Sequence, residues 1–429
     1  MTRTARTAAL CVASVTMAAA VAGCGSSGGS SSSAPGVTKT SVTIGSHQPL
    51  TGPAAPGYSE IAPAAKAFFT YLNAQGGVNG RKINYVYKDD GYNPTNTVNV
   101  VRQLVLQRHV FAIFNGLGTP THTKVVPFLT AEKVPDLFVA SGCPCWDDGA
   151  GQPETFGWQP SYQIEGKLLG AYLKANFAGK KIGVFYQDDD FGQGGLTGLK
   201  EEVGSQVVSA QPYQPGGTNV APQITAIQKS GAEVLVDFTI PAYTALGQLT
   251  SFKLGYKPQL VVSNVGIDPT TVGGLLKEFS KGKAGTALIE GAISDIYLPS
   301  TTDASNPWIA LFKKIHDQYD AKAPFDGNVE YGMAAAYTFA QALKAAGKNP
   351  TRQSLVDAVE KGGFTGPGLV PFRFSGKQHG GYSGVQIAKL TNGAIVPVGV
   401  PQVTDPGTGP IKPYTTKQPA PGDNGVVKG

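Results

Sequence analysis

Short runs of β-branched and aromatic residues alternate with stretches of helical periodicity through most of the sequence, and this alternation constrains the fold class most strongly. The first strand is expected at 41–44, and apolar side chains at 60–74 recur on one helical face until Gly76 and Gly77 end the helix. The pattern then repeats, with strands expected at 83–90, 110–115 and 135–141 and helices expected at 94–107 and 121–131. Strands that alternate with helices of this length are typical of βαβ units and parallel sheets.

A second series of the same kind follows a break near residues 155–163. Its expected strands are 181–187, 206–210, 232–238 and 259–264, and its expected helices lie near 194–203, 221–229 and 243–252. Two such series predict an α/β protein with two doubly wound, Rossmann-like parallel-sheet lobes, and a chain of 429 residues suffices for two full cores.

The sequence after residue 291 departs from this alternation. It predicts a strand that runs into a loop at 290–300, long helices at 307–319, 327–346 and 351–360, and strands and turns at 364–398. The tail from Pro401 contains six prolines and five glycines in 29 residues. We therefore expect this tail to lack a fixed structure, at least in part.

Residues 1–23 are typical of an export signal. Two arginines within 1–6 precede an uncharged stretch of small apolar residues at 7–22, which is short and rich in alanine for a membrane-spanning helix. The Val-Ala-Gly-Cys that follows resembles a bacterial lipobox, which implies cleavage before Cys24 and a lipid on its sulfur. Residues 24–40, rich in Gly and Ser, are then a flexible tether. The alternative is an ordinary signal peptide with an unrelated cysteine.

Composition argues against several function classes. The 35 basic and 29 acidic residues give a net charge of +6 without a basic stripe, so no nucleic-acid partner is expected. No second run approaches the roughly 20 apolar residues of a spanning helix, so a lipid anchor is the only expected membrane contact. The sequence has no G-x-S-x-G, H-E-x-x-H, P-loop or G-x-G-x-x-G motif. We therefore expect neither an enzyme nor a cofactor.

Four segments in order resemble one known family. They are GSHQPLTGPAAPGY at 45–58, LNAQGGVNGRKINYVYKDDGYNP at 72–94, KKIGVFYQDDDFGQG at 180–194 and FTGPGLVPFRFSGKQHGG at 364–381. Their order and spacing resemble the type I periplasmic binding proteins of the leucine/isoleucine/valine-binding branch, which are the substrate-binding proteins of ABC importers. The resemblance covers about 41–400.

The resemblance implies two discontinuous lobes joined by a hinge that the chain crosses three times, with the ligand cleft between the lobes. The N-terminal lobe is expected to comprise 41–160 and about 292–370. The C-terminal lobe is expected to comprise 161–291 and about 371–400, and the tail, 401–429, follows it.

In doubly wound sheets, the carboxyl ends of the strands and the starts of the helices converge on one crevice, where a ligand binds. By the family pattern, Thr119 matches the hydroxyl that holds the ligand carboxylate, and Ala140, Ser141 and Gly142 match neighbouring backbone donors. The family favours a hydroxyl residue where this chain has Gly142, and Ser141 is the candidate to replace it. The alternative for Thr119 is a helix cap.

Three further positions belong to the expected binding site. Phe191 matches an aromatic residue, usually Tyr, that packs on the ligand, and Tyr58 ends the first strand-to-helix turn. Asn264 stands where the amino-acid-binding relatives place an acid that pairs with the ligand's ammonium group. Either another acid provides this pairing, with Asp268, Asp147 and Asp190 as candidates, or the ligand lacks an α-ammonium group, which we favour here.

Two histidines and three aromatic residues are weaker candidates. His47 and His122 fall in turns expected to border the crevice, as ligand-bonding or pH-sensing groups, although surface or supporting positions are commoner for histidines. Core or surface positions are also commoner for the remaining aromatic candidates, Trp146, Trp158 and Tyr243.

The Cys143-Pro144-Cys145 segment is expected to form a tight disulfide beside the binding site, because export leads to an oxidising compartment. A metal site is not expected, because the segment offers two thiols and two acids without a histidine partner.

The sequence therefore predicts an exported solute-binding lipoprotein of an ABC importer on the outer face of the cytoplasmic membrane. It is expected to be a monomer that captures a small polar solute, such as an amino acid, an amide or a small carboxylic acid, and to work with permease and ATPase subunits. The alternatives are a component of a ligand-sensing receptor and, less favoured, a hydrolase on the same fold.

Overall fold

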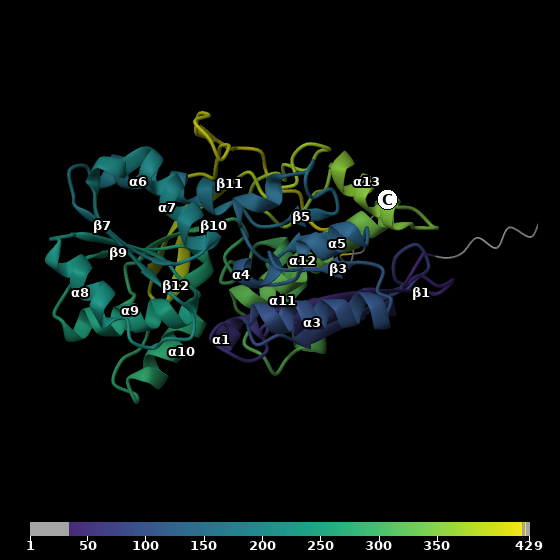
Figure 1. The fold of residues 1–429 in the computed structure, drawn as a ribbon, viewed down its shortest axis with the longest axis horizontal. Coiled ribbons are helices and arrows are strands. Elements are labelled where there is room, and N and C mark those ends of the chain that lie inside the picture. The colour runs from purple at the N-terminus through teal and green to yellow at the C-terminus, as the bar shows by residue number, and fades with distance from the viewer. Residues whose placement is uncertain (1–33, 423–424, 426–429) are drawn as a thin grey trace, which may run out of the picture. The chain divides into compact units, whose positions relative to one another are not determined.

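The computed structural model describes residues 34–422 and Gly425. The expected export signal, Cys24 and the first part of the tether therefore lie outside the described residues. The described elements surround two β-sheets, one built from the first part of the chain and one from the middle and end (Figure 1).

The first sheet contains five parallel strands in the order β2-β1-β3-β4-β5. These are β1 (Ser41–Gln48), β2 (Lys82–Asp89), β3 (Ile113–Phe114), β4 (Asp136–Val139) and β5 (Thr155–Gly157). Its connecting helices are α1 (Ala55–Tyr58), α2 (Ile61–Ala74), α3 (Pro94–Arg102), α4 (Thr119–His122) and α5 (Val126–Ala131). The parallel register confirms the predicted βαβ pattern.

The second sheet has the order β14-β13-β11-β10-β9-β8-β6-β7, with β12 paired to β11. Its parallel part comprises β6 (Ile182–Gln187), β7 (Val207–Tyr213), β8 (Val234–Phe238), β9 (Gln259–Val262) and β10 (Ile293–Ile296). The antiparallel part comprises β11 (Gly384–Thr391), β12 (Ala394–Pro397), β13 (Gln402–Val403) and β14 (Lys412–Pro413). The connecting helices are α6 (Tyr162–Asn176), α7 (Asp190–Val203), α8 (Ala221–Lys229), α9 (Pro241–Lys253) and α10 (Pro269–Phe279).

The last three helices return to the first sheet's side. Of α11 (Pro307–Tyr319), α12 (Gly327–Ala345) and α13 (Arg352–Lys361), the first two pack against α2 and the third packs against α12. The chain thus passes between the two lobes after β5, after β10 and before β11. Because β10 pairs with β9, the return to the first lobe follows Ile296 rather than residue 292.

The C-terminal tail is more ordered than its composition predicts. The tail strand β13 pairs with β11, and the indole Nε1 of Trp308 donates to the carbonyl of Pro419 at 2.7 Å. The buried Lys167 side chain donates to the carbonyls of Gly407 and Gly409. The expectation of an unstructured tail is therefore wrong for its described part, because specific polar partners on both lobes hold it.

The sequence missed two of the longer helices, α6 and α10, and glycines explain the burial of α6. A Cβ at Gly198 of α7 would lie 2.0 Å from the carbonyl oxygen of Gln163, and a Cβ at Gly166 of α6 would lie 2.1 Å from that of Gly195. The two helices can approach this closely only because glycine occupies these positions. Helix α6 therefore buries a face that carries polar as well as apolar residues. Because its apolar residues alone do not follow the helical period, the sequence pattern did not predict this helix.

Candidate functional site

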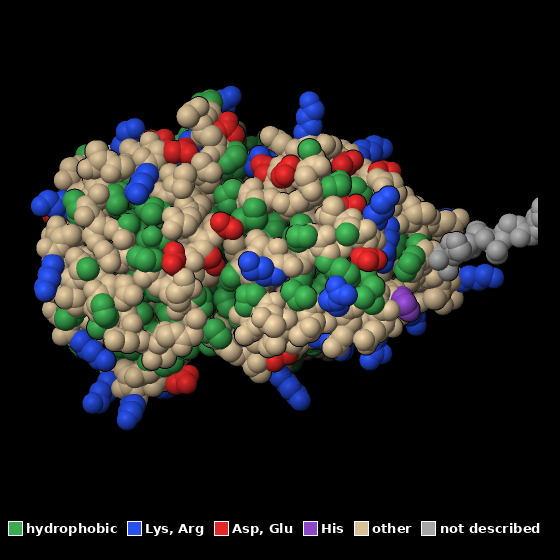
Figure 2. Space-filling model, in the orientation of Figure 1, with side chains coloured by type: hydrophobic (Ala, Val, Ile, Leu, Met, Phe, Trp, Pro, Cys, Tyr) green, Lys and Arg blue, Asp and Glu red, His purple; other side chains and the backbone are tan. Residues whose placement is uncertain are grey.

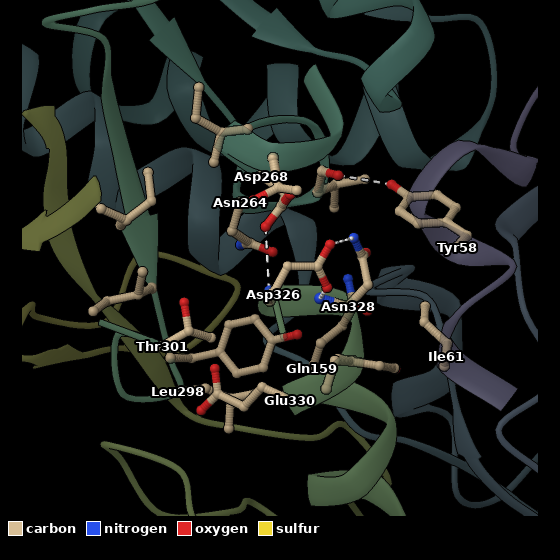
Figure 3. Close-up of a pocket in the computed structure, with 18 of the residues that line it drawn as sticks. Tyr58, Ile61, Gln159, Asn264, Asp268, Leu298, Thr301, Asp326, Asn328 and Glu330 are labelled. Carbon is tan, nitrogen blue, oxygen red and sulfur yellow. Dashed lines mark hydrogen bonds between the residues drawn. The ribbon is translucent and has the colours of Figure 1, made fainter. Parts of the chain in front are cut away.

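A cavity of about 300 Å³ lies between the two lobes, at the ends of strands from both sheets. Of the predicted binding residues, Tyr58, Thr119, Ala140, Phe191 and Asn264 line it, whereas His47, Ser141 and Gly142 do not. Figure 3 shows Tyr58, Gln159 and Asn264 on its wall, together with Asp326 just before α12 and Asn328 within it. The predicted cleft therefore gathers side chains that are far apart in the sequence.

Thr119 begins α4 at the first-lobe wall, and a buried hydroxyl holds its side chain in place. Its Oγ1 lies 2.7 Å from the Oγ of Ser141, which also accepts a hydrogen bond from the backbone N–H of Cys143 at 3.1 Å. Both side chains are buried. Ser141 thus positions Thr119 from behind instead of lining the cavity.

The expected backbone donors differ from the prediction. The N–H of Ala140 donates to the carbonyl of Gly116, and the N–H of Ser141 donates to that of Val139, each at 2.9 Å. A Cβ at Gly142 would lie 2.4 Å from the carbonyl oxygen of Pro160. The first two N–H groups are therefore already bonded within the protein, and the close approach at Gly142 excludes the side chain that the family favours there.

Aromatic rings form the cavity wall between the lobes. The ring centroids of Phe191 and Tyr162 are 4.4 Å apart, and burial raises the pKa of the Tyr162 hydroxyl to about 12. The Tyr58 hydroxyl of the first lobe donates to the carbonyl of Val265 in the second at 2.7 Å. Gln187 Nε2 donates to the Tyr92 hydroxyl at 3.2 Å. These two hydrogen bonds join the lobes beside the cavity.

Asn264 sits against two buried acids, Glu165 of α6 and Asp295 of β10. Its Nδ2 donates to Glu165 Oε1 and to Asp295 Oδ2, each at 2.8 Å, and its backbone N–H also donates to Glu165 Oε1 at 2.8 Å. Burial raises the pKa of Glu165 and of Asp295, and repulsion by Glu165 raises the pKa of Asp295 further. The acids that contact Asn264 are therefore different residues from the three candidates Asp268, Asp147 and Asp190.

Those three aspartates have other partners. Asp268 lines the cavity and caps α10 by accepting a hydrogen bond from the N–H of Thr271 at 2.8 Å. Asp147 forms a salt bridge with Arg373. Asp190, at the start of α7, lies beside the Cys143–Cys145 pair.

A second carboxyl cluster lies where α12 meets α10. Asp326 caps α12 by accepting hydrogen bonds from the N–H groups of Asn328 and Val329, at 3.0 and 3.1 Å. Burial, followed by repulsion from Asp268, raises the pKa of Asp326 to about 7. Its ionised form is thus disfavoured in the native state.

Replacing Asp326 by Asn should remove a pH-dependent cost. The native state keeps the Asp326 proton up to about pH 7, whereas the unfolded chain loses it near pH 4, so this group lowers the free energy of unfolding as the pH rises between these values. Asn caps helices equally well. In urea titrations, Asp326→Asn should therefore gain about 1–2 kcal/mol over the wild type between pH 5 and pH 8. A difference that stays constant with pH would contradict this prediction.

His47 and His122 lie in β1 and α4 beneath the cavity wall, so they take the supporting position that is commoner for histidines and do not contact the cavity. His47 Nδ1 is 2.8 Å from Asp90 Oδ2, His47 Nε2 is 2.8 Å from His122 Nδ1, and His122 Nε2 is 2.7 Å from Asp136 Oδ2. All four side chains are fully buried or nearly so. Burial lowers the pKa of His47. We call this chain of groups the Asp–His–His–Asp array.

Cys143 and Cys145 form the predicted disulfide, with their Cα atoms 5.1 Å apart. Together with Asp190 they are the one group of metal-ligating side chains found among the described residues. Disulfide sulfurs are not thiolates, so the arrangement does not favour a metal. The structure also places Trp146 and Trp158 in the core, and Tyr243 stacks on Tyr213 away from the main cavity.

The comparison with known families decides what kind of protein this is. Residues 41–394 match the family model described as periplasmic binding protein. The chain belongs to the periplasmic binding protein family. Leu/Ile/Val-binding protein homolog 3 of Brucella melitensis is 24% identical over 232 residues, which are 50% of this chain and 57% of that protein. This chain thus spans little more than half the length of that relative in the alignment.

Solved structures agree with this family assignment. A branched-chain amino acid ABC transporter protein from Thermus thermophilus with bound valine is 20% identical, with a TM-score of 0.75 over 86% of this chain and 98% of that one. A fatty acid ABC transporter substrate-binding protein from Thermomonospora curvata is 24% identical, with a TM-score of 0.74 over 87% and 95%. At these identities the structures establish a shared fold, which confirms the predicted fold class.

Two surface properties of this periplasmic binding protein bear on the predictions. No helix in the described part of the chain is long and apolar enough to cross a bilayer. On the face drawn in Figure 2, Lys and Arg side chains are scattered singly among Asp and Glu instead of forming a continuous patch.

Several residues of the binding protein's cavity were not predicted from the sequence: Tyr92, Tyr162, Asp295, Tyr297, Glu330 and Tyr331. Tyr162 begins the helix that periodicity missed. Asp295 lies within a predicted strand, and Glu330 and Tyr331 lie within a long predicted helix. A charged residue inside an otherwise apolar strand was the available signal for Asp295.

Proposed function

We propose that this protein is the solute-binding lipoprotein of an ABC importer. Cys24 carries the lipid that holds it at the outer face of the cytoplasmic membrane. A small polar solute enters between the lobes, the lobes close around it, and the protein delivers it as a monomer to a permease driven by ATPase subunits. The cavity between the lobes, in a chain of the periplasmic binding protein family, carries this proposal.

The contacts that join the lobes support a closing motion. Three hydrogen bonds join the lobes: Tyr58 Oη to the carbonyl of Val265, Gln187 Nε2 to the Tyr92 hydroxyl, and the N–H of Gly327 to Asp268 Oδ2. Each of the three involves at least one residue that lines the cavity. Opening the lobes breaks these bonds at three separate points. A ligand that contacts both walls binds the closed form more tightly than the open form. This difference in affinity shifts the equilibrium toward the closed form.

A thermal-shift screen of amino acids, amides and organic acids tests the proposal. A ligand present at a hundredfold excess over its Kd stabilises the native state by about 2.7 kcal/mol, so a bound solute raises the Tm measurably. If no solute in a broad panel raises the Tm, the proposal is wrong.

Thr119→Ala should largely abolish the shift that the best solute causes. The substitution removes the Thr119 hydroxyl at the first-lobe wall, which Ser141 holds in place. Loss of a hydrogen bond to a charged ligand group costs about 1.5–3 kcal/mol of binding free energy. Thr119→Ser should retain most of the affinity.

Thr123→Val is the matched control, because Thr123 follows the same short helix without lining the cavity. Equal loss in the Thr119 and Thr123 variants would indicate a general disturbance of α4 and contradict a ligand contact by Thr119.

A further inference from the structure

The described chain begins at the end of the first lobe that lies opposite the cavity. Thr119 and Ala140 of the cavity wall follow the carboxyl ends of β3 and β4, whereas the chain enters at the amino end of the parallel strand β1. Figure 1 shows the first described residues at this end, beside β1. The loops that lead into β2, β3 and β4 meet there with the loop after α12. We call these segments the tether end: 34–40, 78–82, 108–111, 131–134 and 344–352.

The proposed lipid brings the tether end close to a membrane. Cys24 and Ala34, the first described residue, are ten positions apart. A fully extended chain spans at most about 3.6 Å per residue, so a lipid on Cys24 keeps the tether end within about 36 Å of the bilayer surface. The second lobe is joined to Cys24 only through the first.

Two half-buried arginines hold the segments of the tether end together. Arg81 Nε donates to the carbonyl of Thr38 at 2.7 Å, and its guanidinium group also donates to a carbonyl in the loop after α12. Arg352 donates to the carbonyls of Val110 and Glu132 at 2.9 and 3.2 Å. The salt bridges that Lys and Arg form within the described residues lie elsewhere. Carbonyl oxygens carry no full charge, so the positive charges of both arginines remain uncompensated.

Exposed cations surround these two arginines. Glu132 is the one acid in the segments of the tether end. Five of the cations there are exposed, and within the described part of the chain none of them belongs to a salt bridge: Lys39, Lys82, Arg108, Lys133 and Lys348. Figure 2 shows blue side chains spaced around the end at which the described chain begins. The tether end therefore presents a net positive charge to its surroundings.

Anionic lipid headgroups fit this end in both charge and position. A negatively charged bilayer attracts each Lys or Arg near its surface, and the attraction falls off within a Debye length, which is about 10 Å at 0.1 M salt. Cations that are spaced over several loops suit such an extended surface, whereas a single small anion is held by converging donors. A lipid anchor combined with a basic surface also holds a protein at a membrane more stably than the anchor alone.

We propose that the tether end is a second membrane contact of this protein and that its exposed cations bind the headgroups of anionic phospholipids. The lipid on Cys24 provides proximity, and the cations provide orientation. The first lobe then faces the bilayer. The 8 residues of β1 span about 26 Å, so the cavity is held about that much farther from the headgroups, in contact with the solution. This inference rests on the lipid anchor of the proposed function and adds a preferred orientation to it.

Vesicle binding by the mature chain with Cys24→Ser tests the surface without the lipid. This chain, 24–429, contains every residue that the structure describes. In sedimentation assays, we expect it to bind vesicles of equal parts phosphatidylcholine and phosphatidylglycerol and not vesicles of phosphatidylcholine alone. Raising the salt from about 0.1 M to about 1 M shortens the Debye length from about 10 Å to about 3 Å and should weaken this binding about tenfold or more.

Charge reversal locates the contact on the molecule. The test variant replaces three exposed lysines of the tether end: Lys39→Glu, Lys82→Glu and Lys348→Glu. The control variant changes the net charge equally at three exposed lysines of the second lobe, near the ends of α9 and α10: Lys253→Glu, Lys257→Glu and Lys281→Glu. We expect the test variant to bind the phosphatidylglycerol vesicles about tenfold more weakly or less, and the control variant to retain most of the binding.

Three results would overturn the inference: no binding to the phosphatidylglycerol vesicles, equal binding to both kinds of vesicle, or equal losses in the test and control variants. The first two are measured on the unaltered tether end, so they decide the matter even if the test variant does not fold. A solute that still raises the Tm of the test variant would leave the proposed solute-binding function intact. Mass spectrometry that finds no lipid on Cys24 would instead contradict the lipid anchor, whatever the vesicles show.

Discussion

His122→Ala should destabilise the protein by about 3–5 kcal/mol, because it leaves a buried carboxylate without its donor. The three hydrogen bonds of the Asp–His–His–Asp array need three protons, whereas two neutral imidazoles supply two. Whichever ring tautomers are present, the array therefore holds one proton more than two neutral imidazoles carry. Removing the His122 ring leaves Asp136 with the Thr155 hydroxyl alone, at 3.0 Å.

Urea denaturation at pH 7 measures this cost, and two further variants explain it. The double variant His122→Ala, Asp136→Ala should be less destabilised than the sum of the single variants, since the stranded charge is gone. His109→Asn alters an exposed histidine of the same lobe, in a backbone conformation that Asn tolerates, and should change the stability by less than about 0.5 kcal/mol. A loss below about 1 kcal/mol for His122→Ala would contradict a charged array.

The array also links the core of the first lobe to the cavity. Asp90 Oδ1 accepts the N–H of Tyr92, which lines the cavity, and His122 belongs to the same short helix as Thr119. A Cβ at Gly116 would lie 2.5 Å from His122 Nδ1, so the strand end packs directly on the two rings. The histidines therefore support the binding wall from below, which is a different role from the ligand contact that their place in turns suggested.

Local patterns allowed the fold to be predicted, and they did so best where one face of an element is apolar. Helix α8 (Ala221–Lys229) and helix α11 (Pro307–Tyr319) have the predicted bounds, because their buried residues follow the helical period. Helix α6 was missed because its buried face includes Glu165 and Lys167, whose partners come from the turn at Asn264 and from the tail. Such partners lie about 100 residues or more away in the sequence, and no local pattern reveals them.

The candidate site was predictable where a single segment determines the position. Thr119 and Ala140 follow strand ends, and strand ends meet at one edge of a parallel sheet. The amide at Asn264 was visible in the sequence, but its hydrogen-bond partners were not, because Glu165 and Asp295 come from α6 and β10. Position by position, the sequence indicates which polar groups are present, whereas their pairing depends on the packing of the two lobes.

Trp158→Ala should cost about 3–5 kcal/mol of stability and also weaken solute binding. Trp158 is fully buried just after β5, where the chain first passes between the lobes, and its Nε1 donates to the Thr338 hydroxyl at 3.1 Å. Its ring centroid lies 4.9 Å from that of Tyr331 and 6.0 Å from that of Tyr297, and both tyrosines line the cavity. Without the indole, the two rings lose their support and the cavity loses its shape.

Trp308→Ala separates these two effects. Trp308 is as deeply buried in the first lobe, packs on Phe312 and Tyr337, and does not line or support the cavity. Both variants should therefore lose similar stability in urea titrations, while only Trp158→Ala should weaken the binding of the best solute by about tenfold at a temperature where both are folded. If Trp158→Ala does not fold, Trp158→Phe takes its place. This variant keeps an aromatic ring, so it should lose both stability and solute affinity, each by a smaller amount. Equal losses of affinity in the Trp158 and Trp308 variants would mean that solute binding follows global stability. That result would contradict the claim that Trp158 supports Tyr331 and Tyr297 at the cavity wall.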